Sequence, residues 1–259
     1  IKEEINIINL NSISNPKGGI IKLSCGGGKC LGLNTPIILF NGTIKMVQDI
    51  KPGDQLMGDD STLRNVISIG RGQELMYKIY SNNHTYTVNS SHILSLYDIE
   101  HKQILDIEIQ DFLKLDNLKK NNLYGFRVQT KFNYKNISMN PYISGMVLSL
   151  LDLFLNNQIK INCIDNILNL IDNWFKNNKI NVEITQVYDF IIKYNLINDI
   201  HIPYEYKANI PEIQLKFIAG IIDVIGILDN NISGYVITFN NITFIEDIKF
   251  ISGSLGIKI

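Results

Sequence analysis

The sequence predicts an α+β protein in which a β-rich region is followed by a region with long helices. Between about residues 30 and 130, short β-prone runs alternate with turn signals such as Asn41-Gly42 and Pro52-Gly53-Asp54, a spacing typical of a compact β domain. From about residue 135, mostly apolar stretches exceed ten residues, which favours buried helices. With 45% apolar and 19% charged residues, the 259-residue chain contains ample material for a core.

Charge and composition exclude several classes of protein. The formal net charge is −1, and the sequence contains arginine at positions 64, 71 and 127 alone, so it lacks a strongly basic nucleic-acid-binding footprint. No run approaches the ~20 apolar residues of a membrane span, and no signal-peptide pattern opens the chain. Three cysteines are too few for a disulfide scaffold, and their odd number predicts a reducing, intracellular location.

A glycine cluster closes the first 29 residues. A predicted strand, Ile20 to Leu23, is followed by Gly26-Gly27-Gly28-Lys29, and glycines before a lysine suit a loop whose backbone N–H groups bind phosphate. Such a loop needs Ser or Thr next to bind Mg²⁺, but the next residue is Cys30, whose thiol is a poor ligand for that hard cation. Two interpretations stay open: a flexible turn, or a phosphate loop interrupted after Lys29.

The glycine cluster resembles the first nucleotide-binding motif of superfamily 2 helicases of large DNA viruses. The resemblance implies that residues 1–29 are a segment of a viral-type helicase host, and it leaves an ATP-dependent helicase fragment as one candidate function.

Several separated sequence blocks begin at Cys30. The first runs from Cys30 to Ile37, and a later one reads Thr87-Val88-Asn89-Ser90-Ser91-His92. In this order the blocks resemble the N-terminal splicing region of an intein, over roughly residues 30 to 100. The resemblance implies an all-β Hint-type splicing domain, shaped like a horseshoe, whose N-terminal part occupies residues 30–134.

The intein resemblance assigns roles to particular residues. The Cys30 side chain is expected to attack the carbonyl of Lys29, so that the amide becomes a thioester, and a thiol suits this step because some thiolate forms near neutral pH. His92 matches the histidine that donates a proton to the departing nitrogen, and its ordinary pKa allows proton transfer near neutrality. No cofactor is expected for splicing.

Asn89 departs from the family pattern, which usually has Thr three residues before the histidine. A side-chain amide can donate a hydrogen bond to a developing oxyanion, so we expect Asn89 to take part in catalysis in this way.

Two apolar stretches, Tyr142 to Leu155 and Ile213 to Leu228, predict long helices in residues 135–259. They resemble the paired helices of LAGLIDADG (DOD-type) homing endonucleases, which are commonly inserted in inteins. In that family the helices pack closely through small residues, and each ends in an acidic residue that holds a divalent metal. The resemblance implies an α/β endonuclease domain over residues 135–259.

The metal-binding acids of that family are not found at the matching positions. Aligning Gly145 with Gly220 places Leu150 and Ile225 where the carboxylates belong, and neither side chain can bind Mg²⁺. Residues 141–259 also carry eight lysines, no arginine and twelve acidic residues, a net charge of −4 that suits DNA poorly. We therefore expect a degenerate endonuclease, with Mg²⁺ as cofactor and DNA as partner only if it were active.

A complete intein of this class ends in an asparagine that cyclises to release the intein. The sequence does not reach such a residue, so we interpret it as an N-terminal fragment in which both domains are incomplete at the C-terminus. The expected partners are the host helicase segments and a C-terminal intein segment. In the complete protein, the expected activity is autocatalytic, single-turnover splicing.

Overall fold

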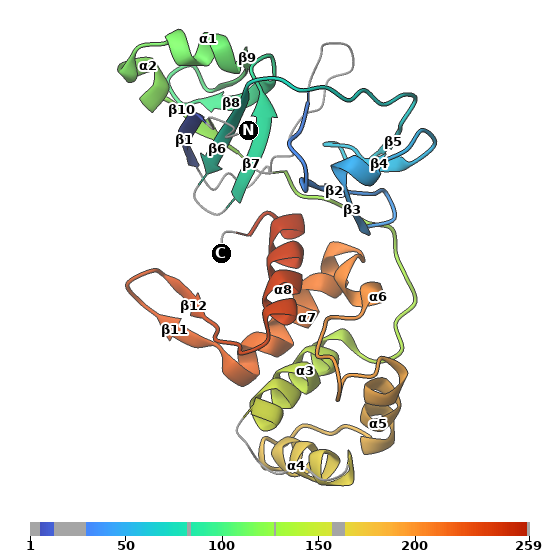
Figure 1. Ribbon diagram of the computed structural model, residues 1–259. Coiled ribbons are helices and arrows are strands. Elements are labelled where there is room, and N and C mark those ends of the chain that lie inside the picture. The colour runs from blue at the N-terminus through green and yellow to red at the C-terminus, as the bar shows by residue number, and fades with distance from the viewer. Residues whose placement is uncertain (1–5, 13–29, 82–83, 127, 157–163, 258–259) are drawn as a thin grey trace. The chain divides into compact units, whose positions relative to one another are not determined.

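The computed structural model describes residues 6–12, 30–81, 84–126, 128–156 and 164–257, and the chain divides into two units (Figure 1). Unit 1 comprises residues 1–132 and 253–259, and unit 2 comprises residues 133–252. The expected domain boundary lay after residue 134, and residues 253–259 were not expected to rejoin the first unit. The predicted strand over residues 20–23 lies outside the described residues.

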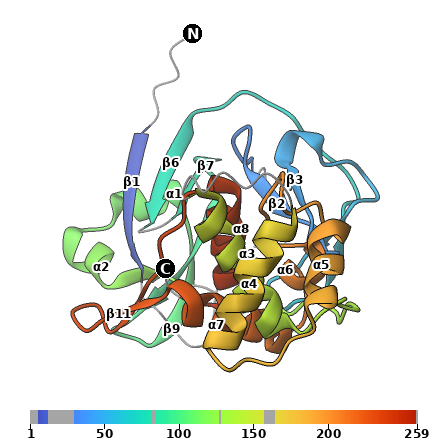
Figure 2. The same ribbon diagram turned by 90° about the horizontal axis from the view of Figure 1, so that it is seen from below.

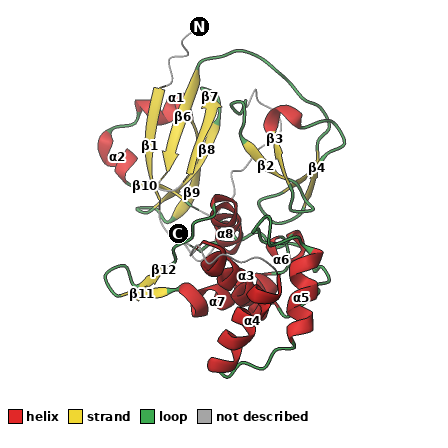
Figure 3. Cartoon of the chain, turned by 60° about the horizontal axis from the view of Figure 1, so that its bottom comes forward, coloured by secondary structure: helices red, strands yellow, loops and turns green. Residues whose placement is uncertain are grey.

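Unit 1 is built around a six-stranded sheet, drawn in yellow in Figure 3. In spatial order its strands are β7 (His84–Asn89), β6 (Met76–Ser81), β1 (Asn6–Ser12), β10 (Leu123–Gly125), β8 (Ile93–Asp98) and β9 (Gln103–Glu108). The strand β1 runs parallel to both of its neighbours, β6 and β10, and Figure 2 shows it beside β6. The other pairs in the sheet are antiparallel. The sheet therefore includes a strand that precedes Cys30 in the chain.

Two short hairpins occupy the sequence between Cys30 and the large sheet. They pair β2 (Pro36–Ile38) with β3 (Ile44–Met46), and β4 (Gln55–Met57) with β5 (Leu63–Asn65). The turn signals noted in the sequence fall at their ends, where Gly42 and Gly53 have φ of 94° and 91°. A side chain rarely adopts this left-handed conformation, which explains glycine at both positions.

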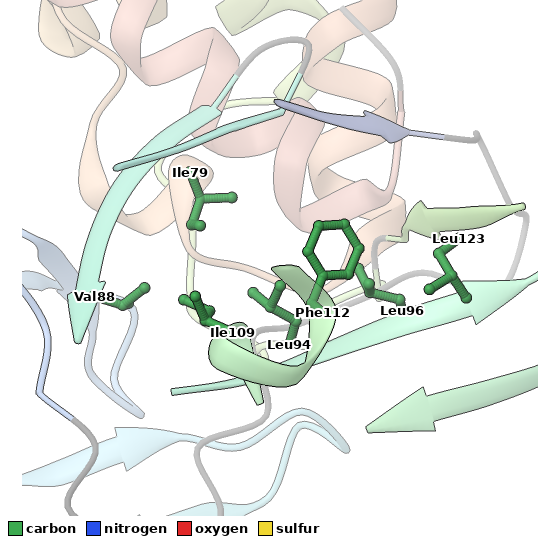
Figure 4. Close-up of a cluster of buried hydrophobic side chains, with 7 residues drawn as sticks. All are labelled: Ile79, Val88, Leu94, Leu96, Ile109, Phe112 and Leu123. Atoms are coloured by element: carbon green, nitrogen blue, oxygen red, sulfur yellow. The ribbon is translucent and has the colours of Figure 1, made fainter. Parts of the chain in front are cut away.

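The core of unit 1 lies between the sheet and the short helix α1 (Ile109–Lys114) (Figure 4). Alternate residues of β8 are buried, as a strand with one covered face requires, and α1 adds two buried side chains three residues apart. A second short helix, α2 (Asn117–Asn121), is capped by Asp116, whose carboxylate accepts from Lys119 N–H at 2.8 Å. The core residues are Ile79, Val88, Leu94, Leu96, Ile109, Phe112 and Leu123.

Unit 2 is mostly helical. Its helices are α3 (Pro141–Asn156), α4 (Ile164–Asn177), α5 (Ile184–Lys193), α6 (Tyr204–Lys207), α7 (Pro211–Ile225) and α8 (Ile242–Leu255), the last of which ends in unit 1. Tyr206 is fully buried, and its hydroxyl is hydrogen-bonded to both the N–H and the carbonyl of Met139. Its ring lies 5.7 Å from that of Phe190 and 5.4 Å from that of Phe217. These contacts join α5, α6 and α7 into one core.

The helices α3 and α7 pack against each other through two glycines. A Cβ atom on Gly145 would collide with the carbonyl oxygen of Phe217, and one on Gly220 would collide with that of Tyr142. Phe217 lies three residues before Gly220, and Tyr142 lies three residues before Gly145, so the contact is symmetric between the helices. The two helices are therefore in register with Gly145 opposite Gly220, and Figures 1 and 2 both draw them together.

Two expectations about this region need correction. The helix expected over residues 213–228 ends at Ile225, because the chain turns to extended backbone at Gly226, and Leu228 lies in the hairpin of β11 (Ile227–Asp229) and β12 (Gly234–Val236). That hairpin is the one strand pair among the described residues of unit 2, so the unit is mostly helical, whereas an α/β domain was expected. In unit 1, the expected all-β region also contains α1 and α2.

None of the described helices has both the length and the apolar character required to cross a membrane.

Candidate active site

The residues after Cys30 lie antiparallel to the end of β7. Asn89 N–H donates to the carbonyl of Cys30 at 3.1 Å, and Gly32 N–H donates to the carbonyl of Thr87 at 2.6 Å. Between them, Leu31 forms a bridge with Val88, which is fully buried in the core of unit 1. The backbone on the C-terminal side of the Lys29–Cys30 bond is therefore anchored to a strand of the main sheet.

Gly32 allows this close approach of the two backbones. A Cβ atom at this position would lie 2.7 Å from Thr87 Cβ, a distance that real Cβ atoms essentially never show, and 3.0 Å from Thr87 Cγ2, which is a tight contact. Glycine is therefore required here for steric reasons, so that Cys30 can reach the end of β7.

The turn between β7 and β8 carries both of the polar residues predicted from the sequence. His92 N–H donates to the carbonyl of Asn89 at 3.2 Å, which closes a tight turn over Ser90 and Ser91. Asn89 is completely buried and His92 is 1% exposed. The carbonyl of His92 accepts from Ile109 N–H at 3.0 Å, so the first residue of α1 fixes the other side of the turn.

The side-chain amide of Asn89 contacts the nitrogen of the bond that is expected to break. Cys30 N–H donates to Asn89 Oδ1 at 3.2 Å. The amide nitrogen Nδ2 donates to Glu74 Oε2 at 2.8 Å and to Ser91 Oγ at 2.9 Å. We expected the amide to donate toward a developing oxyanion, whereas both of its hydrogens are directed at these two oxygens. The amide instead accepts a hydrogen bond from the peptide nitrogen of Cys30.

The surroundings of His92 are aromatic and buried. The ring of Tyr86 lies edge-on to the imidazole, with 6.5 Å between the ring centroids. Burial raises the pKa of Tyr86 to about 12, so its hydroxyl keeps its proton at neutral pH. Cys30 itself is half-buried, and its sulfur is not joined to another cysteine.

Neither Glu74 nor Ser91 was predicted from the sequence. Ser91 lies in the block that contains His92, so its position in the turn offered a signal. Glu74 lies 15 residues before Asn89, in the exposed extended segment that leads into β6, and no spacing or motif marks it. Lys29, the other expected residue of the scissile bond, lies outside the described residues.

The positions expected to correspond to endonuclease metal ligands lie on α3 and α7. The register of Gly145 opposite Gly220 makes Leu150 and Ile225 equivalent, since each lies five residues after its glycine. Leu150 is completely buried, and Ile225 is the last residue of α7. Asp223 accepts from the Tyr142 hydroxyl at 2.5 Å, and this hydrogen bond, with a smaller contribution from burial, raises the pKa of Tyr142 to about 12.

One group of possible metal ligands lies away from this site. The turn between β8 and β9 brings together one oxygen or nitrogen atom each of Asp98, Glu100 and His101, all within 4.8 Å of one another. Asp98 accepts from His101 Nδ1 at 2.7 Å and from the N–H groups of Glu100 and His101. These hydrogen bonds lower the pKa of the Asp98 carboxyl and raise that of His101. The hydrogen bonds within the turn therefore explain why these three side chains lie close together.

Comparison with known families finds a match to the region that contains these residues. The family model described as Hom_end-associated Hint matches residues 30–138. The match begins at Cys30, includes Asn89 and His92, and covers less than half of the chain. It identifies the region as a Hint domain, which is an intein splicing domain associated with homing endonucleases. A Hint domain implies protein splicing of the intein type.

Proposed function

We propose that this chain performs the first step of intein splicing, in which the Cys30 sulfur attacks the carbonyl carbon of Lys29. The observation that carries the proposal is the hydrogen bond from Cys30 N–H to Asn89 Oδ1 at 3.2 Å, because it gives a buried partner to the nitrogen of the bond that breaks. The start of the Hint match at Cys30 supports the same assignment.

The proposed step is a balanced acyl transfer within one chain. The Cys30 thiol loses its proton, a bond forms between sulfur and the Lys29 carbonyl carbon, and the bond from that carbon to the Cys30 nitrogen breaks. The nitrogen takes up a proton and becomes a free amine, so the products are a thioester and an amine. No co-reactant is needed for this balance, and the adjacency of nucleophile and carbonyl favours the step.

Within the proposal, His92 transfers the proton to the departing nitrogen. The turn from Asn89 to His92 supports this role, because its first residue holds the Cys30 nitrogen and its last residue carries the imidazole. An imidazole ordinarily changes charge near neutral pH and can both accept and donate a proton there. Asn89 holds the nitrogen while it becomes positively charged, which is the moment when a hydrogen-bond acceptor stabilises it most.

We also propose that residues 1–29 belong to the host protein that the intein interrupts, a viral-type helicase by resemblance. The pairing of β1 with β6 and β10 supports the idea that this segment is held by the sheet that carries the site. Completing the splicing reaction requires a C-terminal intein segment with its cyclising asparagine. The residues proposed for the first step, Cys30, Asn89 and His92, are all present in this chain, which can therefore be used to test that step.

The other two candidate functions are not favoured by a specific observation. For DNA cleavage, the equivalent positions Leu150 and Ile225 are both apolar, so neither supplies a carboxylate for Mg²⁺. For ATP-dependent helicase activity, the glycine cluster before Lys29 lies outside the described residues.

The test is cleavage of the chain by an added thiol. If a thioester forms at Lys29, an excess of dithiothreitol releases residues 1–29, and hydroxylamine traps the same fragment as a hydroxamate. The strand β1 pairs within the main sheet, so the released fragment can stay bound. The products are therefore separated under denaturing conditions and identified by mass spectrometry.

Three variants accompany the test. Cys30→Ala is expected to abolish cleavage, while Cys163→Ala, which removes a different cysteine, is expected to leave it unchanged. His92→Gln is expected to slow cleavage by about 100-fold, because general acid–base catalysis contributes at least that much. If Cys30→Ala still releases residues 1–29 in response to thiol, the proposed chemistry is wrong.

A further inference from the structure

The side-chain amide of Asn89 can be oriented in two ways, whereas the hydroxyl of the threonine usual at this position both donates and accepts through one oxygen. The oxygen and the NH₂ group of a side-chain amide have nearly the same shape, so the residue can present either an acceptor or a donor to its neighbour. The Cys30 N–H is a donor, and it meets Asn89 Oδ1 at 3.2 Å. If the amide were turned over, two donors would face each other and this hydrogen bond would be lost.

We propose that Glu74 is a positioning residue that fixes the orientation of the Asn89 amide for the acyl shift; the inference rests on the proposed function. An ionised carboxylate only accepts hydrogen bonds, and Glu74 Oε2 lies 2.8 Å from Asn89 Nδ2. Contact with Glu74 therefore requires Nδ2 on that side, which directs Oδ1 toward Cys30. The hydrogen bond to a charged acceptor is stronger than one between neutral groups.

Ser91 cannot set this orientation by itself, although its Oγ lies 2.9 Å from Asn89 Nδ2. A hydroxyl group both donates and accepts, so it can satisfy either orientation of the amide by rotating its hydrogen. Of the three groups that contact the side-chain amide here, the Glu74 carboxylate can only accept and the Cys30 N–H can only donate. Both contacts therefore require the same orientation of the Asn89 amide, with Nδ2 toward Glu74 and Oδ1 toward Cys30.

The orientation matters more as the reaction proceeds. When the Cys30 nitrogen takes up a proton and leaves, its N–H groups become stronger donors, and the hydrogen bond to Asn89 Oδ1 strengthens. An interaction that is stronger in the transition state than in the ground state accelerates the step. Loss of the Glu74 carboxylate removes this preference without touching the reacting atoms, because Glu74 acts through Asn89.

The experiment compares Glu74→Gln with a matched control in thiol-induced cleavage of the full chain. Gln presents either end of its amide to Asn89, so we expect cleavage to slow by roughly tenfold, the size of one charge-assisted hydrogen bond. The control is Glu100→Gln, because Glu100 Oε2 accepts from Asn122 Nδ2 at 2.9 Å in the same unit. This variant alters a similar glutamate–asparagine hydrogen bond that does not involve Cys30, so its cleavage rate is expected to stay within about twofold of the parent.

A second background separates positioning from a general structural effect. In the Asn89→Thr background, the hydroxyl oxygen can accept from Cys30 N–H regardless of the side chain at position 74. Adding Glu74→Gln is therefore expected to change the cleavage rate by less than about twofold. If Glu74→Gln slows cleavage equally in both backgrounds, Glu74 does not act through the orientation of Asn89 and the inference is overturned.

Amide hydrogen exchange tests the inference independently of activity. Glu74→Gln is expected to speed exchange of the Cys30 amide, while the Gly32 amide, bonded to the Thr87 carbonyl, serves as an unchanged internal reference. If the parent chain fails to cleave at all, the proposed function fails, and the exchange result still decides the role of Glu74. If the Cys30 amide exchanges at the parental rate in Glu74→Gln, the inference is wrong.

Discussion

Gly32 shows how one residue without a side chain positions the reactive cysteine. The hydrogen bonds of Cys30 and Gly32 to β7 bracket the bridge between Leu31 and Val88, and they require the two backbones to lie side by side. Any side chain at position 32 meets Thr87, whose Cβ is itself part of the obstruction. Because the Cβ of Thr87 cannot rotate away, the strain is relieved only by moving the backbone near Cys30.

Gly32→Ala is therefore expected to slow thiol-induced cleavage by roughly 10- to 100-fold, because a small displacement of a nucleophile has a large effect on rate. It should also lower the free energy of unfolding by about 1–3 kcal/mol through overpacking. The measurement is the cleavage rate together with a urea titration.

Gly70→Ala is the control for Gly32→Ala. A Cβ atom on Gly70 has no neighbour within 4 Å, and its backbone is not left-handed, so both rate and stability should stay close to the parent. A parental cleavage rate in Gly32→Ala would mean that the close approach at Thr87 does not position Cys30.

At the residue scale, the sequence predicted roles for Cys30 and His92 from their resemblance to a known pattern, and a role for Asn89 from its position three residues before His92. It did not identify Glu74, because a lone glutamate in an extended segment carries no spacing signal, and its contact with Asn89 exists only after β6 and β7 have paired. The sequence also led us to expect a hydrogen bond donated by the Asn89 amide to the oxyanion, whereas in the structure its oxygen accepts from Cys30 N–H. That choice depends on which neighbours accept and which donate, and a sequence does not give those neighbours.

At the scale of elements, the pair of α3 and α7 depends on the two glycines at its contact. Each glycine meets the backbone of the opposite helix rather than a flexible side chain, so the helices cannot make room for a methyl group without separating. The long apolar stretches predicted both helices, and the resemblance to LAGLIDADG endonucleases implied their close contact through small residues. The end of α7 was harder to predict, because the apolar residues continue beyond Gly226 into β11.

Gly145→Ala is expected to lower the free energy of unfolding of unit 2 by about 3 kcal/mol, at the upper end of the usual effect of overpacking. The chain contains a single tryptophan, Trp174, which lies in α4 of unit 2, so its fluorescence in a urea titration reports on this unit.

The same substitution at Gly253, Gly253→Ala, is expected to change the free energy of unfolding in the opposite direction. Gly253 lies in α8, and a Cβ atom there meets nothing within 4 Å. Alanine is the better helix former, so stability should rise by about 0.5–1 kcal/mol. If Gly145→Ala leaves the stability unchanged or raises it, as expected for Gly253→Ala, the helices α3 and α7 do not pack through Gly145.

At the scale of the whole molecule, the residues of the proposed reaction belong to unit 1, whereas most of the long helices belong to unit 2. The residues that contact Cys30, and those that hold the turn of His92, all belong to unit 1. From its change in texture, the sequence predicted a boundary after residue 134. It did not predict that β1 would join the main sheet, because parallel pairing between strands some 70 residues apart leaves no local signal.

This division predicts that the two units respond separately to substitution. Gly145→Ala should shift the Trp174 unfolding transition to lower urea. It should leave the rate of thiol-induced cleavage within about twofold of the parent, because sites without shared partners behave additively. Gly32→Ala should do the reverse, slowing cleavage while the Trp174 transition stays in place. A fall in cleavage rate that follows the stability of unit 2 would show that the acyl shift depends on the helical region, and the proposed confinement of the chemistry to unit 1 would then be wrong.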